Sequence, residues 1–75
     1  MTQLRVFVNA VAVDVNAGAT ALDCIQAFKA DEAASVRQGS RLITDSRGLP
    51  IPNDSIATAG SIYRTVSNRS TASDD

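Results

Sequence analysis

The sequence has no histidine and only one cysteine, Cys24. A single cysteine cannot form an intrachain disulfide. Histidine is the commonest acid–base residue at neutral pH and a common zinc ligand, so its absence argues against a metal centre and against histidine-based catalysis. We therefore expect no metal site. The chain is also expected to have no cofactor and no enzymatic activity of its own. Cys24 has no histidine to activate its thiol, and we expect it to be a small buried apolar residue.

An excess of one charge and a long apolar run are also missing. The sequence contains seven Lys and Arg residues and eight Asp and Glu residues, which gives a formal net charge of −1. No basic stripe is present to neutralise nucleic-acid phosphates. No apolar stretch approaches the roughly 20 residues that span a bilayer, and the start "MTQLRVFVNA" does not have the pattern of a signal peptide. We expect a cytoplasmic protein that binds neither nucleic acid nor membranes.

Aromatic residues are scarce, at 4% of a chain of 75 residues, whereas 44% of the residues are hydrophobic. Much of that hydrophobic content is alanine and valine, so the core must be assembled from small side chains. This length predicts one domain with limited burial. We place the domain at residues 1–66. Residues 67–75, "SNRSTASDD", contain no large apolar side chain and are expected to form a flexible polar tail.

Residues 4–16 alternate between apolar and other side chains, a pattern typical of half-buried β-strands. We predict a hairpin with strands at 4–9 and 11–16. Asparagine tolerates the left-handed backbone of a tight turn, which places the turn at Asn9-Ala10. On the first strand, Leu4, Val6 and Val8 should face the core, with Arg5 and Phe7 on the opposite face.

The period then changes to that of a helix, expected at about 21–30. Thr20 is a suitable N-cap, and Asp23 three residues later completes a weak capping box. The inward face should contain the following residues: Ala21, Leu22, Ile25 and Phe28.

Residues 31–39 predict either a second short helix or a loop with one helical turn. Asp31 could cap this segment, and Gly39 is well placed to end it. The adjacent acids Asp31 and Glu32 suit the start of a helix because they complement its dipole. They imply no pocket and no partner.

The remainder predicts a strand around Leu42-Ile43, a turn at 45–48 and an edge or irregular piece between Pro50 and Pro52. Ile56 is expected to be a buried anchor in the next connector.

In the last strand, 61–66, Ile62 and Val66 are assigned to the core face, with Tyr63 and Thr65 opposite. Arg64 then falls on the core face as well. This conflict predicts either a bulge or a guanidinium that reaches solvent past the helix.

The order of elements predicts an α+β fold in which one main helix crosses a mixed four- to five-stranded sheet, with the last strand beside the first. The stretch "LRVFVNAVAVDVNAGATALDCI" resembles the opening of small sulfur carriers, and "AGSIYRTVS" resembles their closing stretch. Both resemble the β-grasp, or ubiquitin-like, proteins that bacteria encode beside activating-enzyme, conjugating-enzyme and JAB-type peptidase genes.

That resemblance implies a protein modifier whose C-terminal carboxylate a partner enzyme activates with ATP. The family's usual terminal Gly-Gly is absent, because no glycine follows Gly60. We therefore expect a precursor that a peptidase trims around Ser67, Asn68 or Arg69. The alternatives are a non-covalent binding module and a polar end with no function. A sulfur carrier is disfavoured because the glycine pair is absent.

Two aromatic residues, Phe7 and Tyr63, are assigned to the face that the helix leaves open. Exposed aromatic side chains on an open sheet are typical of docking surfaces. We expect these two rings to lie side by side and to form a partner-binding surface, with Arg5 and Arg47 at its rim. The alternative is ordinary cross-strand packing of the two rings.

Overall fold

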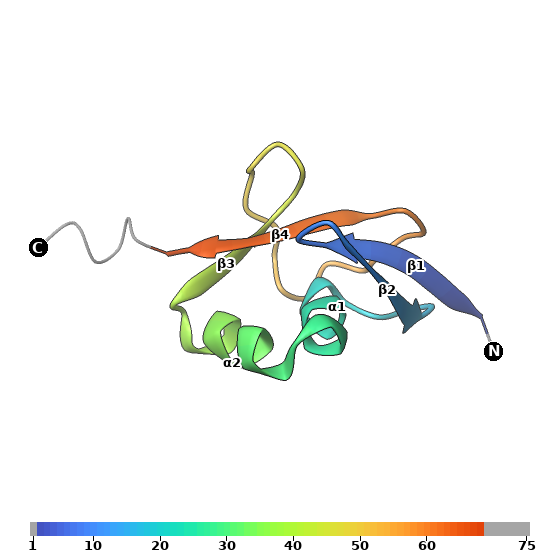
Figure 1. The fold of residues 1–75 in the computed structure, drawn as a ribbon, viewed down its shortest axis with the longest axis horizontal. Helices are drawn as coiled ribbons and strands as arrows, with labels where there is room; N and C mark the ends of the chain where they lie inside the picture. Colours follow the sequence, from blue (N-terminus) through green and yellow to red (C-terminus); the bar gives the residue numbers. More distant parts are fainter. Residues whose placement is uncertain (1, 69–75) are drawn as a thin grey trace, which may run out of the picture.

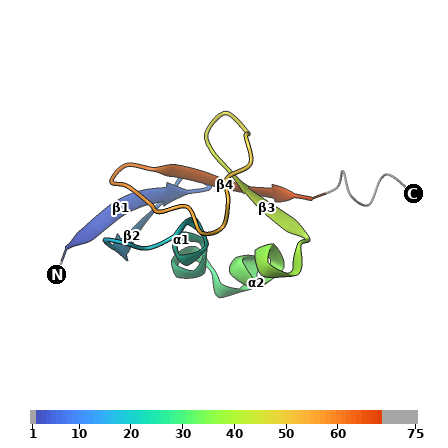
Figure 2. The same cartoon turned by 180° about the vertical axis from the view of Figure 1, so that it is seen from behind.

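The computed structural model describes residues 2–68, and within them the chain forms an α+β fold with a mixed sheet. Its elements in chain order are β1 (Gln3–Val8), β2 (Val11–Asn16), α1 (Ala21–Phe28), α2 (Ala30–Gln38), β3 (Arg41–Thr44) and β4 (Ile62–Ser67). Both helices lie on the same side of the sheet, and the loop that follows β3 rises on the opposite side (Figures 1 and 2).

The sheet order is β2-β1-β4-β3, so β4 lies between β1 and β3 in its centre. β4 runs parallel to β1, whereas the β1–β2 and β3–β4 pairs are antiparallel. The prediction that the last strand lies beside the first is confirmed. The piece around Pro50 is no separate strand; it contacts β3 through an isolated bridge between Pro50 and Thr44 and a hydrogen bond from the Ile51 N–H to the Ile43 carbonyl.

The first hairpin has the predicted turn at Asn9-Ala10. Both residues have left-handed backbones, with φ of 52° for Asn9 and 71° for Ala10. Two consecutive positive φ angles match the twist of a two-residue hairpin. Ala10 pays the steric cost of this conformation, which is about 1 kcal/mol for a residue with a β-carbon.

The first helix begins as predicted, with a capping box in which Thr20 and Asp23 each accept a hydrogen bond from the other's backbone N–H, both at 3.1 Å. The helical path breaks at Lys29, whose extended backbone ends α1 and begins α2. The prediction that Asp31 caps the second helix is therefore wrong, because Asp31 already lies in the first turn of α2. Gly39 ends α2 with a φ of 88°, as predicted.

The core lies between the helices and the sheet. Its largest fully buried side chains are those of Ile25, Ile43, Val6, Val8 and Cys24. The burial of Cys24 is as predicted, and desolvation there raises the pKa of its thiol above the ordinary value.

Ile56 is not a buried anchor, because 59% of it is exposed, whereas the adjacent Ala57 is only 3% exposed. The backbone N–H of Ala57 donates to the carbonyl of Ala19 at 2.8 Å. Ile56 itself forms an isolated bridge with Thr20. These backbone contacts fix the connector against the start of α1. In that position Ala57 points into the core and Ile56 points to solvent.

The assignment of faces on β4 is also wrong. Tyr63 is only 4% exposed and Thr65 is half-buried, whereas Ile62 is 49% exposed. In the parallel pairing, Tyr63 lies beside the buried Val8 and Ile62 lies beside Phe7. Since neighbours in a sheet share a face, Tyr63 belongs to the core, where burial raises its pKa. Arg64 is consequently exposed, and the predicted bulge or displaced guanidinium is unnecessary.

Adjacent substitutions on β4 should therefore have very different effects. We expect Tyr63→Ser to lower the free energy of unfolding by about 3–5 kcal/mol, because it leaves a large cavity in a small core. Ile62→Ser should cost no more than about 1 kcal/mol, since that side chain is already half in solvent. Urea denaturation of both variants measures the difference. An equal loss of stability in the two would contradict the observed face of β4.

Candidate interaction surface and the end of the last strand

The open face of the sheet carries a hollow of about 550 Å³ where β1 and β4 meet the first turn and the loop after β3. We call the residues around it the open-face patch; they are Phe7, Asn9, Ala10, Ser46, Ile62 and Arg64. Successive side chains of a strand point to opposite faces. Because Val6 and Val8 of β1 face the core, Phe7 between them faces the open side of the sheet.

The patch combines an apolar base with one cation. Phe7 is 37% exposed and Ile62 49% exposed, and they are direct neighbours in the β1–β4 register. Arg64 follows two residues later on the same strand and is also exposed. Apolar side chains of this size with an arginine beside them are the composition of protein-docking surfaces. The arrangement suits binding of a protein side chain.

The two arginines predicted to rim this surface do not line its hollow, and each pairs with an acid. Arg5 pairs with Asp14 across β1 and β2, with Arg5 Nε 3.0 Å from Asp14 Oδ1. That hydrogen bond raises the pKa of the Arg5 guanidinium. Arg47 stands at the turn after β3, where its Nη2 lies 3.7 Å from Asp45 Oδ2. Neither of these arginines lines the hollow.

Asp45 organises that turn. Its Oδ1 accepts the backbone N–H groups of Arg47 at 2.8 Å and Leu49 at 3.0 Å. The bond from Leu49 is the main cause of a pKa for Asp45 below its ordinary value, with a further contribution from Arg47. The turn therefore holds Ser46 at the hollow, a residue that sequence reasoning missed.

Of the predicted surface, only Phe7 is in the open-face patch. Tyr63 lies in the core, and the two rings do not share a face. Ile62 and Arg64 occupy the open face where Tyr63 was expected, because the side chains of β4 point to the opposite faces from those predicted. The useful signal in the sequence was the conflict at Arg64, which disappears when the strand is turned over.

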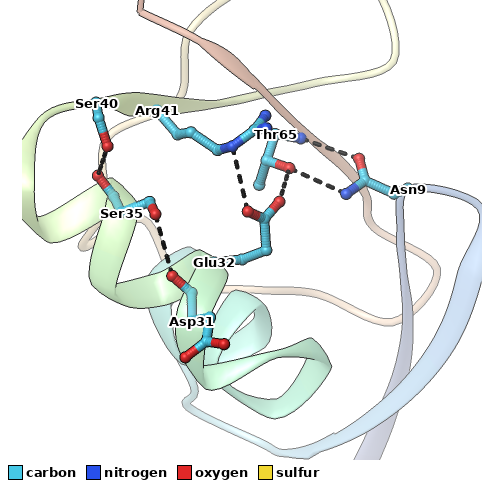
Figure 3. Close-up of polar contacts among 7 residues, drawn as sticks. All are labelled: Asn9, Asp31, Glu32, Ser35, Ser40, Arg41 and Thr65. Carbon is cyan, nitrogen blue, oxygen red and sulfur yellow. Dashed lines mark hydrogen bonds and ion pairs between the residues drawn. The ribbon is translucent and has the colours of Figure 1, made fainter.

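A second group of polar side chains connects the hairpin turn to the second helix and to β3 (Figure 3). The Thr65 hydroxyl donates to Glu32 Oε2 at 2.8 Å and accepts from Asn9 Nδ2 at 3.0 Å. The other oxygen of Glu32 lies 3.2 Å from Arg41 Nε. One chain of contacts thus joins the first turn, β4, α2 and β3. We call Asn9, Glu32, Arg41 and Thr65 the polar bridge.

Asn9 also continues the central strand pairing past the end of β1. Its backbone N–H donates to the Tyr63 carbonyl at 3.0 Å, and its side-chain Oδ1 accepts the Thr65 N–H at 3.1 Å. The chain turns away from β4 after Val8, so no backbone carbonyl of β1 accepts the Thr65 N–H. The side-chain oxygen of Asn9 accepts it instead. From the sequence, Asn9 was predicted only as a turn residue, and Glu32 was expected to suit a helix start and to have no partner; the structure gives Glu32 two partners, Thr65 and Arg41.

The end of β4 is fixed by the connection between α2 and β3. Ser67 pairs with Arg41, so β4 continues beyond the predicted boundary at residue 66. The Asn68 backbone N–H donates to the Ser40 carbonyl at 3.0 Å, and its Nδ2 donates to the Gly39 carbonyl at 2.9 Å. Of the three predicted processing residues, Ser67 and Asn68 are held in place and Arg69 lies outside the described residues.

Residues 2–68 contain no group of three or more His, Cys, Asp or Glu side chains placed to hold a metal ion. In the same part of the chain, neither helix has the length and apolar character that a membrane crossing requires.

The polar bridge should contribute cooperatively to stability. Thr65→Val keeps the β-branched shape but removes the hydroxyl that joins Asn9 to Glu32, and should cost about 1–2 kcal/mol. Glu32→Gln should cost a similar amount. In a double-mutant cycle, the double variant should lose less than the sum by about 0.5–1 kcal/mol, since both changes break the same contact. Denaturant unfolding measures all four proteins.

Asp31→Asn is the matched control, because it makes the same change of acid to amide at the exposed neighbour of Glu32. Its effect should stay within about 0.5 kcal/mol. Strict additivity of Thr65→Val and Glu32→Gln would show that the hydroxyl and the carboxylate do not act together.

No protein-family model, curated protein or solved structure matches this chain.

Proposed function

We propose that this α+β arrangement is a β-grasp fold and that the chain is a ubiquitin-like modifier, made as a precursor and activated at its trimmed C-terminus. The observation that carries this proposal is the position of β4. It is a central strand parallel to β1, and its end is anchored at Asn68 beside Gly39 and Ser40. Whatever follows Asn68 therefore starts from a defined point on the domain.

The anchoring of β4 narrows the proposed trimming point. A peptidase needs an extended, accessible backbone. Ser67 is paired with Arg41, and Asn68 donates to two carbonyls. Cleavage beyond Asn68 leaves all of these contacts intact, whereas cleavage after Val66 or Ser67 would remove some of them. Asn68 and Arg69 both keep these contacts as the new terminus, but a cut directly after Asn68 would have to fit the anchored residue itself into the peptidase. Arg69 is therefore the preferred new terminus.

The chemistry at this terminus belongs to partner enzymes. An adenylating enzyme would join the new carboxylate to the AMP part of ATP and release pyrophosphate. Transfer of the activated chain toward a conjugating enzyme would then release AMP. A JAB-type peptidase would do the trimming. ATP is thus a cofactor of the partner, and the domain contributes a docking surface and a carboxylate. A terminus without glycine requires an activating enzyme whose channel accepts a larger side chain.

The open-face patch is the proposed contact with these partners. It presents Phe7 and Ile62 as adjacent half-exposed apolar side chains with Arg64 beside them. The same patch also supports the second candidate function, a non-covalent binding module that never uses its terminus. A sulfur carrier is disfavoured, because that chemistry uses a terminal glycine pair and no glycine follows Gly60.

The processing step is tested by intact mass. The full chain with an N-terminal affinity tag is produced in its native cells and recovered under denaturing conditions. We expect a species shortened to Arg69, together with heavier species that carry the shortened chain in covalent linkage. In Asn68→Pro, which removes the backbone donor to Ser40, the cut should move toward Val66 because the end of β4 is released.

Asp74→Ala is the control for that substitution, since it changes a residue after position 68 and keeps the backbone N–H donor of Asn68. Its cut should stay after Arg69. A full-length mass as the sole species in cells that also contain the adenylating enzyme and the peptidase would contradict the modifier and favour the binding module.

The docking role of the open-face patch is tested separately with Phe7→Asp. We expect binding to an adenylating enzyme encoded beside this gene to weaken by at least about tenfold, because a carboxylate replaces a central apolar contact. Leu49→Asp is the control, since Leu49 is 53% exposed but does not line the hollow. Calorimetry gives the affinities, and circular dichroism confirms folding. Equal weakening by both variants would contradict the assignment of the patch.

A further inference from the structure

The two edges of the sheet are protected to different degrees. On the outer side of β3, the Ile51 N–H donates to the Ile43 carbonyl at 2.8 Å, and Pro50 bridges to Thr44. Pro50 and Pro52 flank this piece and supply no N–H donors of their own, a common way to close a sheet edge. β2 is the opposite edge, and no described strand lies outside it.

The outward backbone groups of β2 follow from the hydrogen bonds of β1. The Phe7 N–H donates to the Ser61 carbonyl and the Arg5 carbonyl accepts from Gly60, so these two residues bond toward the β4 side. The alternate residues of β1 must then bond to β2 through Val11, Val13 and Val15. Ala12 and Asp14 accordingly present their N–H and carbonyl groups at the open edge.

The side chains of this edge also lack the usual protection against pairing. Edge strands commonly carry a charge that repels another strand. The one charged residue of β2, Asp14, forms an ion pair with Arg5 of β1, in which Asp14 Oδ1 lies 3.0 Å from Arg5 Nε. On the helix side, Val11 is 49% exposed although its cross-strand neighbour Val8 is fully buried. The edge therefore combines free backbone groups, no net charge and an incompletely covered valine.

We propose that β2 pairs antiparallel with β2 of a second copy of this chain, with Val13 on the two-fold axis. Two four-stranded sheets then join into one continuous sheet of eight strands. This pairing places Val11 beside the partner copy's Val15, so that the exposed valine becomes covered. It also places Ala12 opposite the partner copy's Asp14, with the free backbone groups of both facing each other.

The neighbouring antiparallel registers fit less well. Centring the pair on Asp14 would bring two carboxylates directly opposite each other, which is unfavourable across strands. Centring it on Ala12 would place the positive-φ turn residue Ala10 opposite Asp14 and leave Val15 without a valine partner. Of these three registers, the one centred on Val13 matches the exposed Val11 with Val15 and avoids like charges on the other face. This self-complementarity favours a second copy as the occupant.

The contact involves one strand of six residues from each copy. Such an interface lies at the small end of specific protein contacts, so the dimer should be weak and concentration-dependent. The pairing goes beyond the proposed modifier function and does not depend on the C-terminus. It uses the sheet edge and leaves the open-face patch accessible.

Sedimentation velocity from about 10 μM to about 1 mM should show monomer–dimer exchange for the full chain. The register is tested with two opposite charges at one position. Ala12→Lys faces Asp14 twice by symmetry and should tighten the dimer by about three- to tenfold at low salt, whereas Ala12→Asp should weaken it by a similar factor. The gain from lysine should shrink at high salt.

Ala59→Lys and Ala59→Asp are matched controls, because they make the same changes at an exposed position in the connector before β4, outside the β2 edge. Neither should alter dimerisation, and thermal unfolding checks that all variants fold. A monomer at every concentration, or a dimer that responds equally to substitutions at 12 and 59, would overturn the proposal. Weaker dimerisation of both Ala12→Lys and Ala12→Asp would overturn the Val13 register. Such a result would mean that residue 12 of one copy lies opposite residue 12 of the other, so that either charge repels its own copy.

Discussion

The parallel pairing of β1 with β4 is the constraint on which the rest of the structure depends. It brings together two segments separated by more than 50 residues. It also sets which side chains of β4 enter the core, because Tyr63 must share the face of Val8. The register ends where β1 turns, and there the Asn9 side chain supplies the acceptor that the Thr65 N–H requires. A turn residue thus completes the central ladder and begins the polar bridge to Glu32 and Arg41.

This pairing has consequences on both faces of the sheet. On the helix face, one large aromatic residue fills a core otherwise made of valine, isoleucine, alanine and cysteine. On the opposite face, Phe7 and Ile62 are brought side by side with Arg64 next to them, and these residues line the hollow that we propose as a docking surface. The Asp45 turn adds Ser46 at its border. The domain has the features of a protein that is recognised by others, and the proposed modifier and binding-module functions both use this surface.

Three parts of the molecule are suited to contacts with other proteins, and they are spatially distinct. The open-face patch presents apolar side chains, the β2 edge presents backbone groups, and the end of β4 presents the start of the tail at an anchored residue. The proposed contacts depend on different chemistry: dispersion and desolvation in the first, a hydrogen-bond ladder in the second, and cleavage of a peptide bond in the third. A modifier that is trimmed, activated and bound by several enzymes has use for such separation.

Local patterns in the sequence determined most elements of the fold. The alternation over residues 4–16, the Thr20–Asp23 capping box and Gly39 all specify structure through near neighbours, and each was predicted correctly. Only the tertiary structure decided the face of β4, the exposure of Ile56 and the partners of Glu32. Ile62 and Tyr63 are both apolar enough for a core, and alternation alone cannot choose between them. The choice comes from the register against β1, an interaction between distant segments that no local window contains.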